Sequence, residues 1–518
     1  MLLKNAMNNS AKRKIGVLLT YVQIILSVSL SIFSTPIITA SLGQEEFGIY
    51  SLVLSFASYI NLFQLGIGSS YIRYYSVYRK NNDIKRIENM NGTYLLIFSL
   101  LGAIALFFSI IMALNMQLVF PTEVAVEQVQ LAQRCLFVLA ITTVISFPAG
   151  VFISYIIAHE EFVFYKILNI VYSLVRIGSI LAVLSIGKKS VAIFVVTMIC
   201  TVVLNIAYIG FCIKKLKFRC SLCYLDKKFI KSVFVFSFFI ALNSIVDQLN
   251  WNIDKIIITK ISGTVLTAIY AIGSQLNTMY MEISTSLSDV FTPMIHKVAQ
   301  EIDYNKKFTQ IMIKVGRIQF LVLGVVISGF FVCGKQFINI WLGNDYELAY
   351  YVSLVLMIPV TIPLIQNVGI EMLRARNKHK YRSIIYSIMA VGNMILSIPL
   401  CKVFGIVGAA SGTSIMLIVA NGIIMNLYYK NSLGIDIKLF WKNICKLLPA
   451  PMSLGFLGCL ITKMINIESM IELLIFILSF SLVYLTVVWC FSMNSYEKSL
   501  VRSVVSKFLS FVGKKSNE

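Results

Sequence analysis

Apolar runs of about 20 residues recur along the whole chain, and short polar connectors separate them. A helix of ~20 residues is long enough to cross the ~30 Å hydrocarbon core of a bilayer. We count fourteen such runs, so the pattern predicts an all-α polytopic membrane protein with about 14 transmembrane helices. The composition of the 518 residues agrees, because 58% hydrophobic residues, 13% charged residues and a mean hydropathy of +0.83 are too apolar for one soluble core.

Polar residues interrupt the seventh run at "DQLNWNIDK", residues 247–255. Asp247 is expected ~20 Å along this helix, close to the bilayer centre. Asn243, Asp247, Asn250 and Asp254 are spaced i, i+4, i+7 and i+11, which places them on one helical stripe. An ionised side chain that faces lipid at this depth costs roughly 2.5–3.5 kcal/mol. The stripe is therefore predicted to face the protein interior or a wet cavity.

The eighth run carries a second polar stripe, with Gln275, Glu282 and Asp289 at i, i+7 and i+14. We predict that the two stripes line one side of a cavity. The alternative is that they hydrogen-bond to each other and hold the helices together. Lys255 adjoins Asp254 near the outer surface, where its side chain either joins the cavity or extends to the lipid headgroups.

Arg176 lies about ten residues into the fifth run, near the expected midplane of the bilayer. A guanidinium group stays charged there and can hold a phosphate through two parallel hydrogen bonds. Arg176 is therefore the candidate for binding an anionic group. The alternative is a buried ion pair with Asp247 or Glu282. Arg317 stands near a cytoplasmic helix end, where an interfacial position is expected.

The net charge of +22 is mainly a signal of topology. With the N-terminus in the cytoplasm, the connectors and tails on that side carry 35 of the 45 Lys and Arg residues, and the opposite side carries 7. This asymmetry fits the positive-inside rule with both termini cytoplasmic. Attraction to anionic headgroups is a secondary effect, and no nucleic-acid partner is expected. "NNSAKRKIG" leads directly into a full apolar run, so we expect no cleavable signal peptide.

Cysteine and histidine give no sign of a metal or cofactor site. The ten cysteines lie mostly within apolar runs, and the single close pair, Cys220 and Cys223, has no second pair or nearby histidine. No Gly-rich phosphate loop or nucleophile motif is present either. We expect no metal, no cofactor and no catalytic residue.

The chain contains an internal repeat. At an offset of 220 residues, runs 1 and 2 align with runs 7 and 8. The matched pairs are Ile37 and Ile257, Ile38 and Ile258, Thr39 and Thr259, Gly43 and Gly263, Ile49 and Ile269, and Tyr50 and Tyr270. A weaker match sets Gly187 against Gly405. The repeat predicts two parallel six-helix halves, residues 1–213 and 214–430. Residues 431–518 then hold two extra helices and an amphipathic cytoplasmic tail.

Several segments resemble the polysaccharide-repeat (Wzx-type) flippases of the multidrug/oligosaccharidyl-lipid/polysaccharide exporter superfamily. They are "PIITASLGQEEFGIYSL", "RYYSVYRKNNDIKRIEN" and "NIDKIIITKISG", together with the six-plus-six-plus-two arrangement. The resemblance implies a MATE-like fold in a bacterial cytoplasmic membrane. It also implies alternating-access translocation of an undecaprenyl-diphosphate-linked oligosaccharide for O-antigen or capsule. A polysaccharide polymerase or chain-length regulator is a candidate partner.

Two other functions stay open at this point: an ion-coupled multidrug antiporter of the same superfamily, and a membrane enzyme of polysaccharide assembly such as a polymerase or ligase. The short external connectors disfavour the enzyme. For the flippase, the cavity residues would be Arg176, Asn243, Asp247, Asn250, Asp254, Lys255, Gln275 and Glu282. A buried carboxylate can change its protonation between conformations. We therefore assign ion coupling to Asp247 or Glu282 as a hypothesis.

Overall fold

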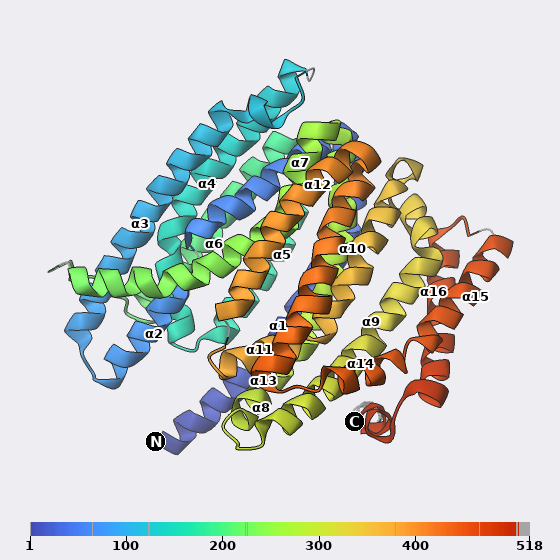
Figure 1. Ribbon diagram of the computed structural model, residues 1–518. Helices are drawn as coiled ribbons and strands as arrows, with labels where there is room; N and C mark the ends of the chain where they lie inside the picture. The colour runs from blue at the N-terminus through green and yellow to red at the C-terminus, as the bar shows by residue number, and fades with distance from the viewer. Residues whose placement is uncertain are drawn as a thin grey trace, which may run out of the picture. The chain divides into compact units, whose positions relative to one another are not determined.

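The computed structural model describes residues 2–64, 66–122, 125–222, 224, 226–378, 380–465, 467–503 and 506. Of residues 2–14, 17, 239, 243 and 289 it describes the backbone alone. Every regular element in these residues is a helix (Figure 1). The predicted amphipathic tail falls largely outside them, since residues 507–518 are not described.

The helices form two compact units, Met1–Ile272 with Tyr386–Gly412, and Gly273–Ile385 with Thr413–Glu518. The first unit contains α1 (Leu2–Ile60), α2 (Ile67–Lys80), α3 (Ile84–Leu114), α4 (Val126–Ala158), α5 (Phe162–Ser185), α6 (Ser190–Lys214) and most of α7 (Lys227–Ser288). The second contains the end of α7, α8 (Thr292–Val298), α9 (Tyr304–Leu342), α10 (Leu348–Ile365), α11 (Asn367–Ala375), α13 (Met425–Leu433), α14 (Ile437–Cys445), α15 (Pro449–Met464) and α16 (Met470–Val487). Residues of α12 (Lys380–Leu417) belong to both units.

Short helical segments of other types join these elements. They are the 3-10 turns η1 (Asn61–Gln64), η2 (Met116–Val119), η3 (Asp289–Phe291) and η4 (Asn344–Tyr346), and the π-helical segments η5 (Ile418–Ile424) and η6 (Val488–Ser492).

Within the described residues, eleven continuous helices are long and apolar enough to cross a membrane. Three of the eleven are interrupted by a glycine outside the helical region of backbone conformation, at Gly43, Gly263 and Gly405. Dividing each of these three at its glycine gives fourteen segments. The count of about 14 spans stays a prediction, but these breaks explain why fewer continuous helices are seen.

The glycines that the repeat aligns share an unusual backbone conformation. Gly43 and Gly263 have φ angles of 74° and 83°, and Gly187 and Gly405 have φ angles of 78° and 61°. Residues with a Cβ rarely adopt such positive φ values, so each pair marks an equivalent turn between helical segments. The division at residues 213 and 430 itself stays a prediction, since the compact units follow other boundaries.

The segment that follows Gly43 has two structural roles in the first unit. A Glu46 carboxylate oxygen accepts a hydrogen bond from the Ser190 amide at 2.8 Å, and so caps the N-terminus of α6. Gly48 lies directly against the backbone of Thr264, where a Cβ would come within 2.0 Å of the Thr264 carbonyl oxygen. The close approach of these two backbones therefore requires glycine at position 48.

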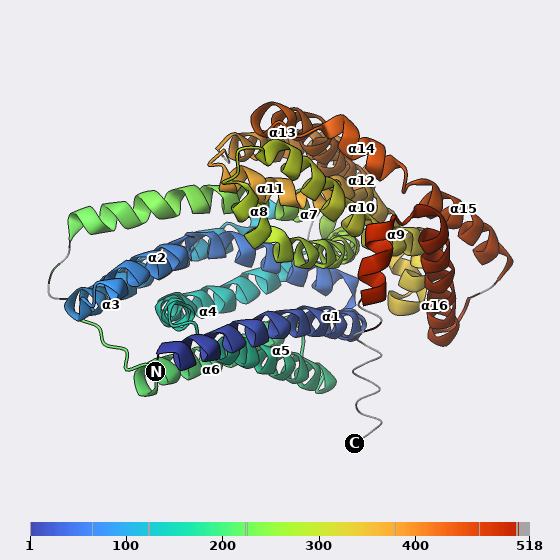
Figure 2. The same ribbon diagram turned by 90° about the horizontal axis from the view of Figure 1, so that it is seen from below.

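The first unit packs as a bundle in which α3 lies beside α4, and α1 beside α5 (Figures 1 and 2). Two amides near the start of α3 hold the connector between α6 and α7. Asn91 donates to the Arg219 carbonyl at 2.7 Å and accepts from the Tyr71 hydroxyl at 2.6 Å. Asn89 pairs with both backbone groups of Tyr224. These bonds explain why polar residues occupy the buried end of an apolar helix.

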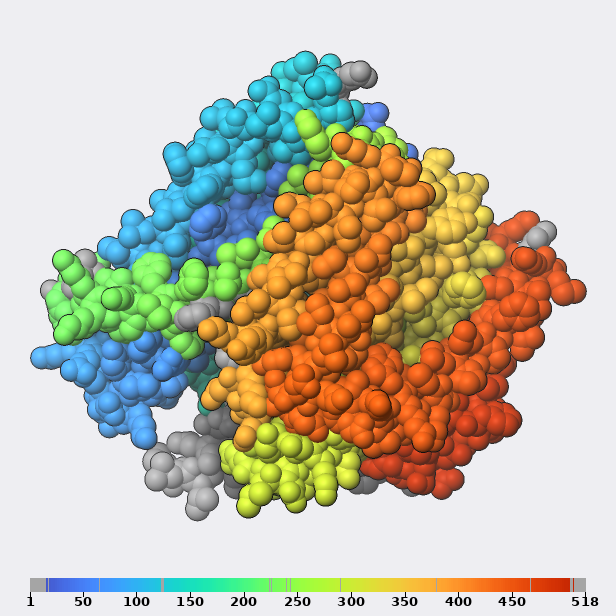
Figure 3. Space-filling model, in the orientation of Figure 1, coloured from blue at the N-terminus to red at the C-terminus, as the bar shows by residue number. Residues whose placement is uncertain are grey.

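In the second unit, α15 and α16 pack against α9, as the red and yellow surfaces of Figure 3 show. A buried ion pair fastens this end of the chain. Arg317 of α9 and Glu497 are 6% and 4% exposed, and the Arg317 guanidinium donates to both Glu497 carboxylate oxygens at 2.6 and 2.9 Å. It also donates to the carbonyls of Asn443 and Ser492 at 3.0 and 2.9 Å. The ion pair gives Arg317 a structural role, and its expected interfacial position stays a prediction.

The Gly48 contact predicts that Gly48→Ala lowers the thermal unfolding midpoint of the purified protein. The added methyl group forces two backbones apart, and overpacking of this kind costs roughly 1–3 kcal/mol. Gly210→Ala is the matched control, because no atom lies within 4 Å of a Cβ there. Equal midpoints for the two variants would contradict the close approach.

The ion pair predicts that Arg317→Ala destabilises the protein by about 3–5 kcal/mol, since it leaves Glu497 buried without its cation. The double variant Arg317→Met with Glu497→Leu should unfold closer to the wild type. Arg374→Ala is the control, because Arg374 pairs with Glu371 while 55% exposed and surface pairs contribute about 0–1 kcal/mol. The measurement is thermal or denaturant unfolding in detergent. A loss no larger than that of the control would show that the pair adds nothing.

Candidate functional site

The polar stripe of α7 changes from exposed to buried along its length. Asp247 is exposed, whereas Asn250 and Asp254 are 2% and 1% exposed. The side chain of Asn243 lies outside the described residues. The continuous helix across 243–254 fits the predicted spacing. Burial of Asn250 and Asp254 shows that only part of the stripe is accessible in this conformation.

Asp254 is held by the helix segment that follows the Gly263 turn. A carboxylate oxygen of Asp254 accepts a hydrogen bond from the Tyr270 hydroxyl at 2.7 Å. Close by, the hydroxyls of Thr259 and Thr267 lie 2.8 Å apart. These contacts join the helical segments before and after Gly263. Asp254 therefore has a structural partner, Tyr270, and its place in a cavity stays a prediction.

Asn250 differs from its neighbours because neither its amide nitrogen nor its amide oxygen has a hydrogen-bond partner among the described atoms. A buried polar group without a partner costs free energy, and such groups call for an explanation. A ligand group that reaches Asn250 in another conformation would supply the missing partner.

The other residues predicted to line the cavity are Lys255, Gln275 and Glu282. Lys255 is half-buried, and no ion pair of its side chain occurs among the described residues. Gln275 and Glu282 are also half-buried, but they lie at the end of α7 that belongs to the second unit, whereas residues 243–254 belong to the first. The joint cavity of the two stripes stays a prediction.

Arg176 lies on α5, with its guanidinium carbon 5.8 Å from the centre of the Tyr172 ring. Its Nε is buried and has no hydrogen-bond partner among the described atoms. Among the described residues, no carboxylate lies within 4.0 Å of the Arg176 guanidinium. The alternative ion pair between Arg176 and Asp247 is therefore not formed within the first unit.

Lys166 is a second cation on α5 that the sequence did not single out. Its ammonium group donates to the Gln23 side chain of α1 at 3.2 Å, and no carboxylate pairs with it in the described residues. Its spacing of ten residues from Arg176 corresponds to ~15 Å along one helix, but it is not a same-face spacing, so the sequence carried no clear signal for this pair.

Lys166 and Arg176 lie ~80° apart around α5 and ~15 Å apart along it, so they form a broad basic face of this helix, and Lys166 contacts α1 through Gln23. Polar groups adjoin the basic face. The Tyr172 hydroxyl of α5 lies 3.1 Å from the Thr201 hydroxyl of α6. Charges that lack a counter-ion inside a membrane protein are costly and usually functional. This face has the chemistry to bind an anion. For a metal ion, no group of three or more His, Cys, Asp or Glu side chains occurs in the described residues.

Comparisons with known proteins agree with this architecture. A family model described as "Polysaccharide biosynthesis protein" matches residues 13–299. A protein of Shigella flexneri named "Putative O-antigen transporter" is 21% identical over 404 residues, covering 77% of this chain and 93% of that protein.

Among solved structures, "Lipid II flippase MurJ, inward closed conformation" superimposes with a TM-score of 0.73 at 15% identity, covering 92% of this chain and 98% of that one. An inward-facing multidrug resistance MATE family transporter of the MOP superfamily gives a TM-score of 0.65 at 13% identity, covering 80% and 99%.

The protein is therefore a multi-pass all-α membrane protein with the fold of the MATE transporters and the MurJ flippase. Since the matched segment is more than half of its length, the chain belongs to the polysaccharide biosynthesis protein family. The predicted fold class and the predicted family resemblance are both confirmed.

The unpartnered amide of Asn250 predicts opposite effects on stability and transport. Asn250→Leu keeps a similar volume and removes two unsatisfied polar atoms, so the thermal midpoint should stay equal or rise. Transport should fall roughly tenfold or more if the amide binds cargo in another conformation. Asn205→Leu is the control, because Asn205 is similarly buried but bonds to Ser146 and should lose stability. An Asn250→Leu protein that is stable and fully active would exclude a role in transport.

Proposed function

We propose that this protein translocates undecaprenyl-diphosphate-linked oligosaccharide repeat units across the bacterial cytoplasmic membrane for the synthesis of O-antigen or capsule. Membership of the polysaccharide biosynthesis protein family supports the pathway, and the name of the Shigella flexneri relative supports transport. The observation that carries the proposal is the basic face of α5. A diphosphate needs fixed positive charge within the membrane, and Lys166 and Arg176 supply it with no carboxylate beside them in the described residues.

The proposed mechanism is alternating access, with both termini in the cytoplasm. Binding of the diphosphate must be stronger in the inward-facing state than in the outward-facing state, because equal affinity would not drive release. Arg176 grips the diphosphate from the inner side. It then exchanges this anion for the exposed carboxylate of Asp247, which lies in the same unit.

One of the two carboxylates, Asp247 or Glu282, is proposed to couple transport to an ion gradient by taking up and releasing a proton or Na⁺. Asp247→Asn and Glu282→Gln preserve shape while removing charge. Normal transport by both variants under every proton and sodium gradient tested would end the coupling hypothesis.

The alternative function is ion-coupled export of small molecules, which the similarity to a multidrug transporter favours. A second alternative, an enzyme of polysaccharide assembly, has no support from the described residues beyond the family name.

Deletion of the gene tests the proposal directly. The surface glycan should disappear while lipid-linked repeat units accumulate on the inner leaflet, and the cloned gene should restore export. Arg176→Ala should reduce export roughly tenfold or more, because a charge-assisted hydrogen bond contributes about 1.5–3 kcal/mol. Arg176→Lys should recover only part, since the two-point grip is lost.

Arg134→Ala is the control, because Arg134 is exposed on α4. Loss of glycan without accumulation of intermediates would indicate an enzyme. Altered drug resistance with intact glycan would indicate the small-molecule exporter. Full activity of a stable Arg176→Ala protein would remove Arg176 from cargo binding.

A further inference from the structure

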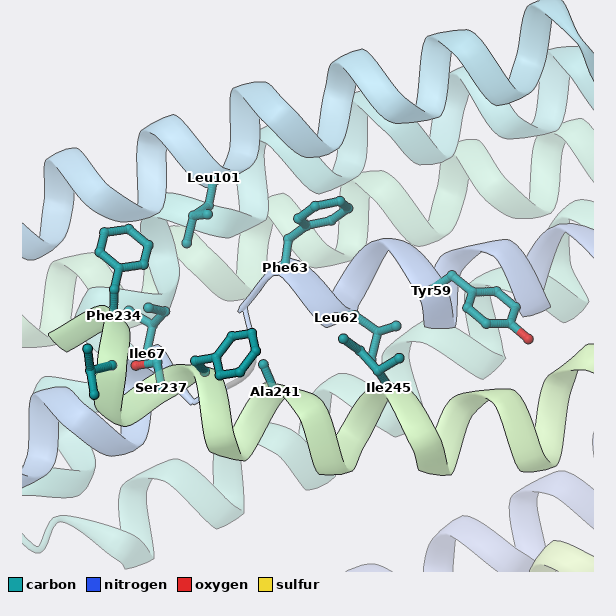
Figure 4. Close-up of a pocket in the computed structure, with 11 residues that line it drawn as sticks. Tyr59, Leu62, Phe63, Ile67, Leu101, Phe234, Ser237, Ala241 and Ile245 are labelled. Carbon is teal, nitrogen blue, oxygen red and sulfur yellow. The ribbon is translucent and has the colours of Figure 1, made fainter. Parts of the chain in front are cut away.

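An apolar groove runs along α7 within the first unit (Figure 4). Its volume is about 780 Å³, and its walls come from α1, η1, α2, α3 and α7. Figure 4 shows Phe63 and Leu101 across the groove from Ala241 and Ile245 of α7. The lining of α7 extends over residues 234–245, or ~17 Å of helix.

The groove lies beside a break in the neighbouring helix. Residues 61–64 leave α1 as a 3-10 turn, and Gly66 has a φ angle of 83° before α2 begins. Gly66 packs against the backbone of α7, where a Cβ would come within 2.7 Å of the Ser237 carbonyl oxygen. The two backbones therefore nearly touch at Gly66, whereas the small side chain of Ala241 leaves space farther along α7.

Basic residues continue the groove-lining row of α7 toward the N-terminus of this helix. The row consists of residues three and four apart on one helical face: Lys227, Lys231, Phe234, Phe238, Ala241 and Ile245. The last four of these line the groove. Both lysines are exposed, and no ion pair of either ammonium group occurs among the described residues. The same face of α7 is therefore cationic at its start and apolar beyond it.

The two ends of the groove differ in charge. Residues 226–231 hold three lysines and one aspartate, a net charge of +2, and the Asp226 carboxylate already accepts from the amides of Lys228 and Phe229 at 2.9 and 3.2 Å. At the other end, Ile245 is the last lining residue of α7, and the exposed Asp247 follows two positions later. An amphiphile with an anionic head is therefore favoured with its head at the lysines and its chain toward Ile245.

A buried hydroxyl lies near the lysine end of the groove. Ser237 lines the groove, is 3% exposed, and has no hydrogen-bond partner for its hydroxyl among the described atoms. It lies close to Ile67 of α2 (Figure 4) and six residues after Lys231, ~9 Å along the helix. A buried donor without an acceptor calls for a ligand oxygen. A glycerophospholipid carries ester carbonyls close to its phosphate, whereas a plain hydrocarbon chain would leave this hydroxyl unpaired.

We propose that this groove binds an anionic glycerophospholipid such as phosphatidylglycerol. Its phosphate is held by Lys227 and Lys231, an ester carbonyl accepts from the Ser237 hydroxyl, and one acyl chain fills the space beside Ala241. The lysines distinguish this lipid from zwitterionic phospholipids, whose phosphate already has a cation in the same headgroup. The site is separate from the cargo, so it does not depend on the proposed function.

Photo-crosslinking in the full-length protein tests the site. A photoreactive phenylalanine analogue replaces Phe238, which lines the groove, or Phe107 of α3, which is equally exposed at 62% and does not line it. The vesicles contain equal amounts of phosphatidylglycerol and phosphatidylcholine, with some undecaprenyl phosphate. The ratio of phosphatidylglycerol to phosphatidylcholine adducts should be roughly threefold or more higher at 238 than at 107. Equal ratios at the two positions, or a polyisoprenyl adduct as the main product at 238, would overturn the proposal.

Two lysine variants separate this site from general attraction to a basic surface. Lys231→Gln should lower the phosphatidylglycerol enrichment at 238 roughly threefold or more. Lys228→Gln makes the same change of charge, but residue 228 lies off the groove-lining row, so the enrichment should persist. If both variants lower the enrichment equally, the basic surface attracts anionic lipid without a site and the proposal is wrong.

Ser237→Ala tests the contact with the ester. The variant loses an unpartnered hydroxyl, so the thermal midpoint of the detergent-purified protein should stay equal or rise, while phospholipid adducts at 238 should fall roughly threefold or more. Ser244→Ala is the control, because the Ser244 hydroxyl bonds to the Ile240 carbonyl and does not line the groove. Equal adduct yields for the two serine variants would overturn the proposed position of the lipid.

Discussion

The fold depends on one constraint: backbone N–H and C=O groups inside hydrocarbon must be paired, because no water is present to replace a missing bond. Helices satisfy this condition segment by segment, and the chain reverses only where a residue can leave the helix at low cost. Gly43 and Gly263 provide such reversals with positive φ angles. The contact between Gly48 and Thr264 then brings two of these turns together within the first unit.

The same constraint makes the surroundings of each charged side chain informative. Arg317 has a carboxylate and two carbonyls around its guanidinium, and so it joins α9 to the C-terminal helices. Arg176 and Lys166 have no carboxylate near them in the described residues, although each stands on a membrane helix. The ion pair of Arg317 therefore marks a structural role, whereas Arg176 and Lys166 are the cations for which a binding role is proposed.

Helix breaks also create space for ligands. The interruption between α1 and α2 opens an apolar groove beside α7, and the same helix becomes polar where that groove ends. The apolar groove, the polar stretch of α7 and the basic face of α5 all lie in the first unit.

The sequence by itself determined that the chain lies in a membrane, that it is helical and where the glycine turns fall, because hydrophobic run length and glycine position are local properties. It also identified the polar stripe of α7 and Arg176, since polar residues stand out in an apolar run. It did not reveal Lys166, whose meaning depends on the approach of α5 to α1, nor the partner of Arg317, which is 180 residues away. Burial of Asp254 against Tyr270 and exposure of Asp247 were likewise decided by tertiary structure, because helical spacing specifies a shared face but not what packs against it.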